Sequence, residues 1–265
     1  MTRLIRHTTH YHFEHPVIYA LQKVRLHPQS GPTQEVKSWE VQVEGGRIEA
    51  GYRDHYGNHV DLVSADEGVS DLTIIAHGAV MTKDKGGVLG EVYGRAPLWH
   101  FLQDTPLTAT ADSIADLAGI IPRNTDILSG LHALSASILE KVPYEAGHTD
   151  TATTASEAVM LGKGVCQDHS HIFIASARHA GVPARYVSGY LYMSDQEEQE
   201  ASHGWAEAHV EGLGWVGFDV SNGICPDRNY IRIAIGRDAQ DATPITGMRI
   251  GTGDASMIVT LQVQQ

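Results

Sequence analysis

The sequence of 265 residues predicts an α+β protein: an N-terminal antiparallel β-sandwich, then a unit in which a cysteine-bearing helix packs on an antiparallel sheet. Three observations predict this class. Short runs with turn signals fill the first eighty residues, helical patterns follow between residues 111 and 161, and a helix from Cys166, with a nearly all-apolar run at 172–177, leads into further alternating runs.

The N-terminal strands are indicated by alternation between turn residues. Residues 39–43 alternate and stop at a pair of glycines, and residues 54–58 form a turn before the apolar run 60–63. Regular short strands of this kind are typical of an antiparallel sandwich.

The domain boundary is placed where periodicity is lost. Residues 82–97 are rich in glycine and charge, so we interpret them as a linker. The chain therefore divides into a β-rich domain, residues 1–95, and a second domain, residues 96–265, which ends in a C-terminal strand.

Helices follow the linker. Residues 111–118 form a short helix, and apolar residues recur at helical spacing from Ile127 to Ile138 after a cap at Asn124 or Thr125. Thr154 and Glu157 form a capping box for the next helix, which ends before Gly162.

Composition excludes several classes of function. The net charge of -13 argues against a nucleic acid or an anionic membrane as partner, because both require a basic surface. No apolar run approaches a membrane span, the N-terminal residues lack the apolar core of a signal peptide, and two cysteines do not make a disulfide scaffold. We therefore expect a cytoplasmic protein, and we expect no cofactor. A disulfide between Cys166 and Cys225 stays possible.

Cys166 is the candidate nucleophile. It follows Gly162 and Gly164 and precedes an Ala-rich apolar run at 172–177, and Gly181 and Pro183 mark the end of the helix, so we place Cys166 in the first turn of a buried helix. The unpaired N–H groups and the positive end of the helix dipole favour a thiolate there. A lone cysteine is more often inert packing, so the assignment depends on a base and an acid elsewhere.

His203 and Asp219 supply that base and acid. Each belongs to an alternating run, and Gly212 and Gly214 between the runs predict a hairpin whose paired residue numbers sum to about 424. Asp219 then faces Trp205, and His203 is its diagonal neighbour on the same face, at roughly 7–8 Å. Cysteine, histidine and aspartate in this order match the logic of a thiol triad.

Four sequence blocks carry a family resemblance. They are Gly-Val-Cys-Gln-Asp at 164–168, Gly-Val-Pro-Ala-Arg-Tyr-Val-Ser-Gly-Tyr at 181–190, His-Gly-Trp-Ala-Glu at 203–207, and Gly-Trp-Val-Gly-Phe-Asp at 214–219. This core resembles bacterial transglutaminase-like proteins, and the first eighty residues resemble their β-rich N-terminal domain.

The resemblance implies a transglutaminase-like, papain-like fold. It also implies that Cys166 is the nucleophile, His203 the general base and Asp219 its partner. One departure is visible, because Val220 and Ser221 stand where the family usually has Pro-Thr.

We therefore expect amide-bond acyl transfer on a peptide or protein substrate, most often hydrolysis. The alternative is transfer of the acyl group to an amine, which is the reaction of a transglutaminase. Two alternatives stay open. The protein could bind peptides without catalysis, or it could bind a metal through Cys166, His203, Asp219 and His209. The sequence does not reveal the oligomeric state.

Several further residues are expected near the predicted triad. Tyr144, Gln167 and Trp205 are candidate residues of the substrate cleft, and Glu207 and His209 either support the site or pack. The acidic segment 195–200 leads to His203 and is interpreted as a solvated loop.

Four histidines crowd the first predicted strand. No cysteine or close set of acids completes a metal site around them, so we interpret them as surface residues and expect no metal there. They are His7, His10, His12 and His15.

Overall fold

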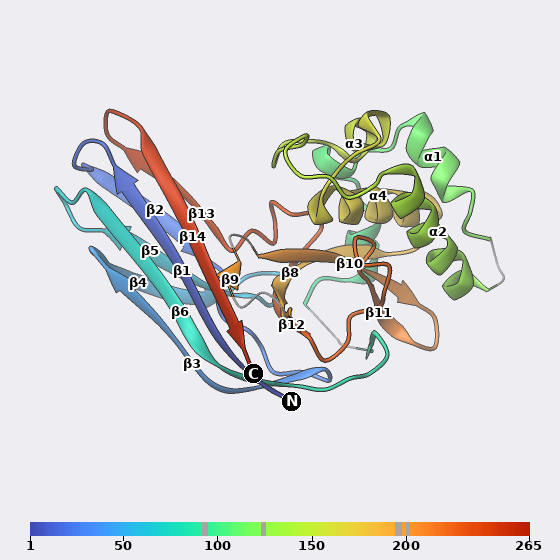
Figure 1. Cartoon of the computed structure of the whole chain (residues 1–265), viewed down its shortest axis with the longest axis horizontal. Helices are drawn as coiled ribbons and strands as arrows, with labels where there is room; N and C mark the ends of the chain where they lie inside the picture. The colour runs from blue at the N-terminus through green and yellow to red at the C-terminus, as the bar shows by residue number, and fades with distance from the viewer. Residues whose placement is uncertain (92–94, 123–125, 194–197, 200–201) are drawn as a thin grey trace.

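The computed structural model describes residues 1–91, 95–122, 126–193, 198–199 and 202–265, with only the backbone for 198–199. It confirms the predicted α+β class. A β-sandwich forms one side of the molecule, and a sheet with helices on it forms the other (Figure 1).

The sandwich is built from two antiparallel sheets. One has the order β3–β6–β1–β14–β9, with strands β1 (Thr2–Phe13), β3 (Gln34–Glu44), β6 (Asp71–Thr82), β9 (Glu198–Gln199) and β14 (Ala255–Gln264). The other has the order β13–β2–β5–β4, with strands β2 (Tyr19–Val24), β4 (Gly46–Arg53), β5 (His59–Ala65) and β13 (Ile245–Ile250). Alternate residues such as Phe13, Val24, Val63 and Leu72 point inward and form a shared core.

A third antiparallel sheet carries the helices. Its order is β12–β8–β10–β11–β7, with strands β7 (Val88–Gly90), β8 (Ala184–Leu191), β10 (His203–Val210), β11 (Gly214–Phe218) and β12 (Tyr230–Gly236). Helix α4 (Cys166–His179) packs on β8 and β10, so its apolar residues are fully buried.

The remaining helices surround α4. They are the 3-10 helices η1 (Leu98–Leu102) and η2 (Pro106–Thr108) and the α-helices α1 (Asp112–Ala118), α2 (Ile127–Lys141) and α3 (Ala155–Leu161). The expected capping box of Thr154 and Glu157 is present, and Gly162 ends α3 in the left-handed conformation. Asp126 caps α2, whereas Asn124 and Thr125 lie outside the described residues.

Strand pairing crosses the division placed at residues 95 and 96. Strand β14 pairs with β1 and β13 pairs with β2, so the C-terminal strands complete the sheets of the sandwich. Strand β7 lies inside the expected linker and pairs with β11. Local periodicity identifies a strand but does not specify a partner more than 200 residues away, so the sequence division stays a prediction.

Polar side chains of the sandwich bind the third sheet. Asn58 donates to the Ile235 carbonyl at 2.8 Å and accepts from the Ile235 N–H at 2.9 Å. Gln34 makes the same pair of contacts with Arg232, at 2.9 and 2.8 Å. Each amide replaces a strand partner for β12, so the two units are joined by hydrogen bonds of defined register.

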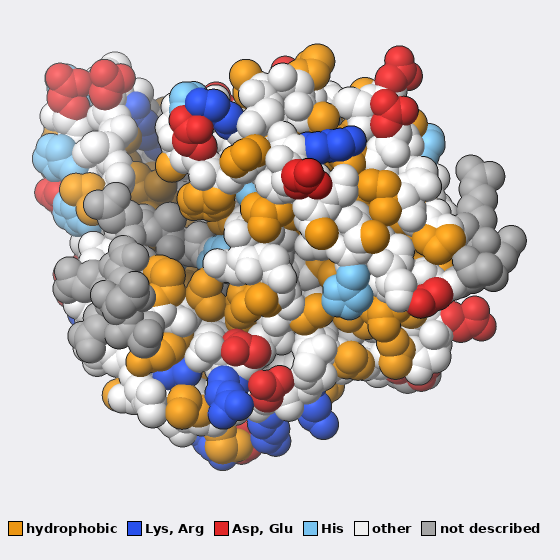
Figure 2. Space-filling model, turned by 45° about the vertical axis from the view of Figure 1, so that its right-hand side comes forward, with side chains coloured by type: hydrophobic (Ala, Val, Ile, Leu, Met, Phe, Trp, Pro, Cys, Tyr) orange, Lys and Arg blue, Asp and Glu red, His pale blue; other side chains and the backbone are white. Residues whose placement is uncertain are grey.

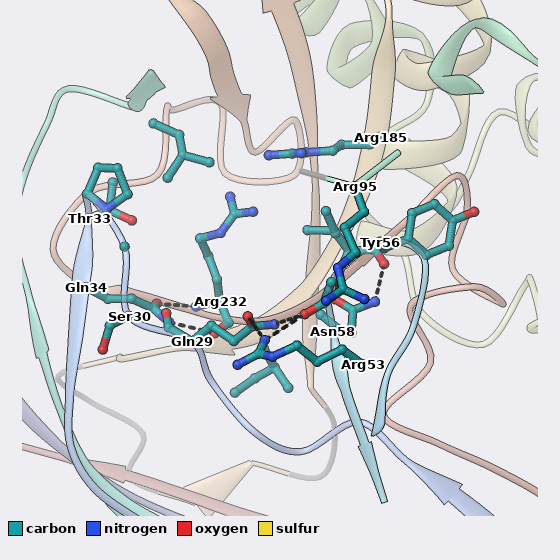
Figure 3. A pocket seen from close by; sticks show the side chains of 17 residues that line it. Gln29, Ser30, Thr33, Gln34, Arg53, Tyr56, Asn58, Arg95, Arg185 and Arg232 are labelled. Carbon is teal, nitrogen blue, oxygen red and sulfur yellow. Dashed lines mark hydrogen bonds between the residues drawn. The ribbon is translucent and has the colours of Figure 1, made fainter. Parts of the chain in front are cut away.

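A cavity of about 300 Å³ lies at this joint (Figure 3). Arg53, Arg185 and Arg232 line it, and both Arg185 and Arg232 contact the buried carboxylate of Glu207. Glu207 is therefore structural, because it neutralises part of the buried guanidinium charge. Within the described lining there is no residue of the predicted triad.

The surface seen in Figure 2 mixes acidic and basic side chains around a central band of hydrophobic ones. Within the described residues, no helix is both long enough and apolar enough to span a membrane.

Candidate active site

Cys166 occupies the first position of α4, as the sequence predicts, and is partly exposed. The Asp168 carboxylate accepts from the Val165 N–H at 2.8 Å and from the Thr149 hydroxyl at 2.7 Å. A side chain at Gly164 is excluded, because its Cβ would lie 2.8 Å from the Asp168 Cβ. The turn before the thiol is thus fixed by a buried acid and by a glycine.

His203 and Asp219 lie together as the hairpin register requires. Ala206 pairs with Phe218 and Glu207 with Gly217, which confirms the predicted register. The ladder ends at Phe218, so Asp219 does not pair with Trp205 as predicted but bridges to Ile224. The His203 Nε2 atom lies 2.6 Å from the Asp219 Oδ2 atom. Because Asp219 occupies Nε2, Nδ1 is the ring nitrogen left to interact with the Cys166 thiol.

The buried carboxylate of Asp219 is held ionised by several donors. Burial alone raises its pKa, but hydrogen bonds from His203, Tyr230 and Asn222 outweigh burial and hold the pKa below its usual range. The Tyr230 hydroxyl and the Asn222 amide each donate to Oδ2 at 2.7 Å. A fixed negative charge therefore faces the imidazole.

The imidazole of His203 is poised in its protonated form. Burial lowers its pKa, but hydrogen bonds with Asp219 and Cys166 and the charges of both groups raise it to about 10. At neutral pH this favours an imidazolium beside the sulfur, and an imidazolium in turn stabilises a thiolate.

Aromatic rings hold His203 from one side. Trp205 is only 1% exposed and lies roughly parallel to the imidazole, with ring centroids 6.2 Å apart. Tyr230 meets Trp205 edge-on at 5.4 Å. Trp205 thus supports the imidazole, and its burial leaves it little surface to offer a substrate.

His169 ties the start of α4 to the turn after Asp219. Its Nε2 atom lies 2.7 Å from the Val142 carbonyl, which can only accept, so Nε2 carries a proton. Burial lowers the pKa of His169, and in the neutral ring Nδ1 accepts from the Ser221 hydroxyl at 2.8 Å. Ser221, one of the two departures from the family pattern, thus helps to place Asp219 relative to Cys166.

Two family models match parts of this chain. Residues 116–220, which include all three residues of the predicted triad, match the transglutaminase-like superfamily. Residues 4–81 match the bacterial transglutaminase-like N-terminal region. Residues 116–220 therefore form a transglutaminase-like core, and residues 4–81 form a bacterial transglutaminase-like N-terminal region.

Individual relatives cover most or part of this transglutaminase-like chain. ML0607, an uncharacterized protein of Mycobacterium leprae, is 26% identical over 270 residues, which are 97% of this chain and 96% of that protein. Rv2569c of Mycobacterium tuberculosis is 31% identical over 138 residues, covering 48% of this chain and 44% of that protein.

A solved structure shares the fold. The crystal structure of a candidate cysteine protease from Cytophaga hutchinsonii has a TM-score of 0.79 and 23% identity, and it covers 99% of this chain and 90% of that one. Superfamily and fold together support a cysteine-dependent enzyme in general terms.

Two of the predicted cleft residues lie beside the transglutaminase-like site. Tyr144 is 55% exposed and bridges to Gly164 in the turn before Cys166. Its pKa is raised by burial of its hydroxyl and by the charges of Cys166 and Asp219. Gln167 donates to the Asp150 carbonyl at 3.4 Å, next to a hollow that Asp150 and Met160 help to line.

The alternative metal site at the triad does not form. His209 is six residues further along β10 than His203, which is roughly 20 Å, and its ring packs edge-on against Trp215 at 5.4 Å. Cys225 is free, as is Cys166, so the two cysteines form no disulfide.

The histidines of β1 differ from one another in burial. His7 is only 2% exposed, so its assignment to the surface is wrong. Its ring nitrogens contact the hydroxyls of Tyr190, at 2.9 Å, and Thr9, at 3.0 Å. His7 is buried because β1 lies between β6 and β14 with this face toward β8, and no local pattern signals that long-range contact. His10, His12 and His15 keep at least partial exposure.

The sequence also missed the donors to Asp219. Tyr230 begins β12, eleven residues after Asp219, and Asn222 lies in a turn. Neither residue stands in a periodic or motif position, so no sequence signal marked it.

Proposed function

We propose that the protein is a cysteine-dependent enzyme that hydrolyses an amide bond in a peptide or protein. The observation that carries this proposal is the chain of contacts from Cys166 through His203 to Asp219, closed by Tyr230 and Asn222. Nucleophile, base and orienting acid are the three parts that a thiol acyl transfer requires.

The reaction follows from the protonation states. The Cys166 thiolate attacks the carbonyl carbon, and the His203 imidazolium gives its proton to the departing amine, which leaves an acyl-enzyme thioester. Water then attacks the thioester while His203 accepts its proton, and the acid is released with the thiolate–imidazolium pair restored. The Cys166 N–H lies at the first helical position, where it lacks an intrahelical acceptor, and can donate to the oxyanion.

Hydrolysis is favoured over amine transfer by the access of water. Cys166 is partly exposed and Tyr144 beside it is more than half exposed, so solvent can reach a thioester at this position. A transferase needs a second site that favours an amine over water. Of the acidic segment 195–200, which could attract an ammonium group, only the backbone pairing of Glu198 and Gln199 with β14 is described.

A peptide library assayed with and without excess primary amine tests the proposal. We expect free acid as the main product, loss of turnover in C166A, and retained turnover in C225A, which serves as the matched thiol control. Dominant amine incorporation would assign the transglutaminase-type reaction instead. Peptide binding without turnover by the wild type would assign a binding protein, and turnover by a folded C166A protein would refute the triad.

A further inference from the structure

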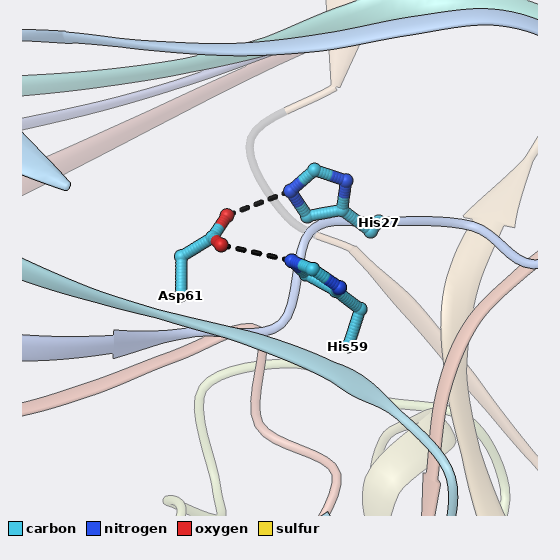
Figure 4. Close-up of side chains that lie close together, drawn as sticks. All are labelled: His27, His59 and Asp61. Atoms are coloured by element: carbon cyan, nitrogen blue, oxygen red, sulfur yellow. Dashed lines mark hydrogen bonds and ion pairs between the residues drawn. The ribbon is translucent and has the colours of Figure 1, made fainter. Parts of the chain in front are cut away.

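Three side chains converge on the sandwich, far from the triad in sequence. His27 follows β2, and His59 and Asp61 lie two residues apart on β5, so the latter two face the same side of the sheet. The His27 Nε2 atom lies 2.7 Å from Asp61 Oδ2, and the His59 Nε2 atom lies 2.9 Å from Asp61 Oδ1 (Figure 4).

The three groups have the chemistry of metal ligands. One ligand atom from each lies within 4.8 Å of the others, and among the described residues this is the only such group of three or more. Asp61 is buried, at 4% exposure, whereas both imidazoles are half-buried. A buried carboxylate requires a positive partner, and here two nitrogen donors are aimed at it.

Space over the cluster is kept open by Gly51. This glycine faces Asp61 across the β4–β5 ladder, and a Cβ on it would lie 3.1 Å from Asp61 Oδ1 and 3.3 Å from His59 Nε2. No unusual backbone angle demands glycine here, since Gly51 is not among the residues with positive φ. A glycine inside a strand often marks a close approach by another group. Gly51 is itself exposed, so the opening leads to solvent.

We propose that His27, His59 and Asp61 bind one divalent transition-metal ion of the zinc class, with a water molecule at the position over Gly51. Two imidazoles and one carboxylate suit zinc and its neighbours better than Mg²⁺ or Ca²⁺, which prefer oxygen ligands. Bonds of ~2.0–2.2 Å would place tetrahedral ligand atoms roughly 3.3 Å apart. The present nitrogen–oxygen distances need to widen by only a fraction of an ångström.

The position of the cluster suggests what the ion would do. The side-chain amides of Gln34 and Asn58 bind β12 of the third sheet. His27 lies shortly before Gln34 in the chain, and His59 directly follows Asn58. An ion here would link the two segments that join the sandwich to the third sheet. Its binding should therefore raise thermal stability, independently of whether the triad hydrolyses amides.

Zinc binding can be measured on the whole chain in a C166A/C225A background, which removes both thiols as competing ligands. After treatment with a chelator, we titrate with zinc chloride by calorimetry and measure bound zinc by mass spectrometry. One ion per chain and a raised Tm are expected. In H27Q and D61N the affinity should fall by more than the roughly 10–100-fold that loss of an outer hydrogen-bond partner costs a metal site.

Two further variants make the test specific. H10Q/H12Q is the matched control, because His10 and His12 both contact the exposed Asp71 on the same sandwich, at 3.2 and 2.9 Å; zinc binding should be unchanged there. G51A keeps all three ligands but should weaken binding by crowding the open position.

Circular dichroism checks that each variant is folded, and H27Q decides if D61N does not fold. No zinc bound to the parent, unchanged affinity in H27Q, or loss of binding in H10Q/H12Q would overturn the proposal.

Discussion

Replacing Asp219 by Asn tests whether its charge sets the protonation of His203. The substitution keeps the shape of the side chain but removes the charge that lies 2.6 Å from Nε2. A hydrogen bond to a charged group contributes about 1.5–3 kcal/mol, and one pKa unit corresponds to about 1.4 kcal/mol. The pKa of His203, raised to about 10 in the wild type, should therefore fall by roughly 1–2 units in D219N.

The imidazole can be titrated directly by NMR, with the His203 resonance assigned from its absence in H203Q. Activity at neutral pH should fall by roughly 10²–10⁴-fold in D219N, the range of general acid–base catalysis. Y230F is the matched control, because it removes a donor to Asp219 and leaves the negative charge on the carboxylate. It should not lower the pKa of His203. An unchanged pKa in D219N, or an equal fall in Y230F, would refute this account of the site.

Three further predictions concern the thiols, the acid limit of stability and the helix start. An ordinary thiol is almost wholly protonated at about pH 6. Brief iodoacetamide treatment at this pH should label Cys166 before Cys225, because burial raises the pKa of the Cys225 thiol. Equal labelling of the two cysteines, measured by mass spectrometry, would contradict this prediction. Burial lowers the pKa of His7 to about 4, so the stability that His7 contributes is full above pH ~6.5 and is lost as pH falls, by about 2–3 kcal/mol at pH 4.5. Urea unfolding of H7Q should show a smaller difference between pH 7 and 4.5 than the wild type. Asp168→Ala should cost about 1–2 kcal/mol of unfolding free energy, because it removes the acceptor for the Val165 N–H, and an unchanged urea midpoint would count against that role.

The elements of the core could be predicted because their signals are local. A glycine pair fixes the turn at Gly212, and the side-chain period of two then fixes which residues of β10 and β11 face each other. The capping box at Thr154 and the glycine after α3 are likewise contained within a few residues. The spacing therefore predicts that His203 and Asp219 lie at the same end of the hairpin, although Asp219 itself lies just beyond the last ladder pair.

The surroundings of Asp219 could not be predicted because they depend on distant chain segments. Asp219 leaves the ladder after Phe218 and bridges to Ile224, which turns its carboxylate toward donors from a turn and from β12. The burial of His7 and the pairing of β14 with β1 have the same origin. Periodicity says which face of a strand is apolar, but not which strand will cover it.

The polar contacts at both ends of β12 connect the candidate active site to the sandwich. Tyr230, at its start, donates to the carboxylate of Asp219, and Ile235, near its end, is bound by Asn58 of the sandwich. Because one strand makes both contacts, a shift of β12 along its axis would disturb the donor to Asp219 and the joint together. The sandwich thus contributes to the geometry of the candidate active site, although within the described residues its own side chains do not enter the chain of contacts from Cys166 to Asp219.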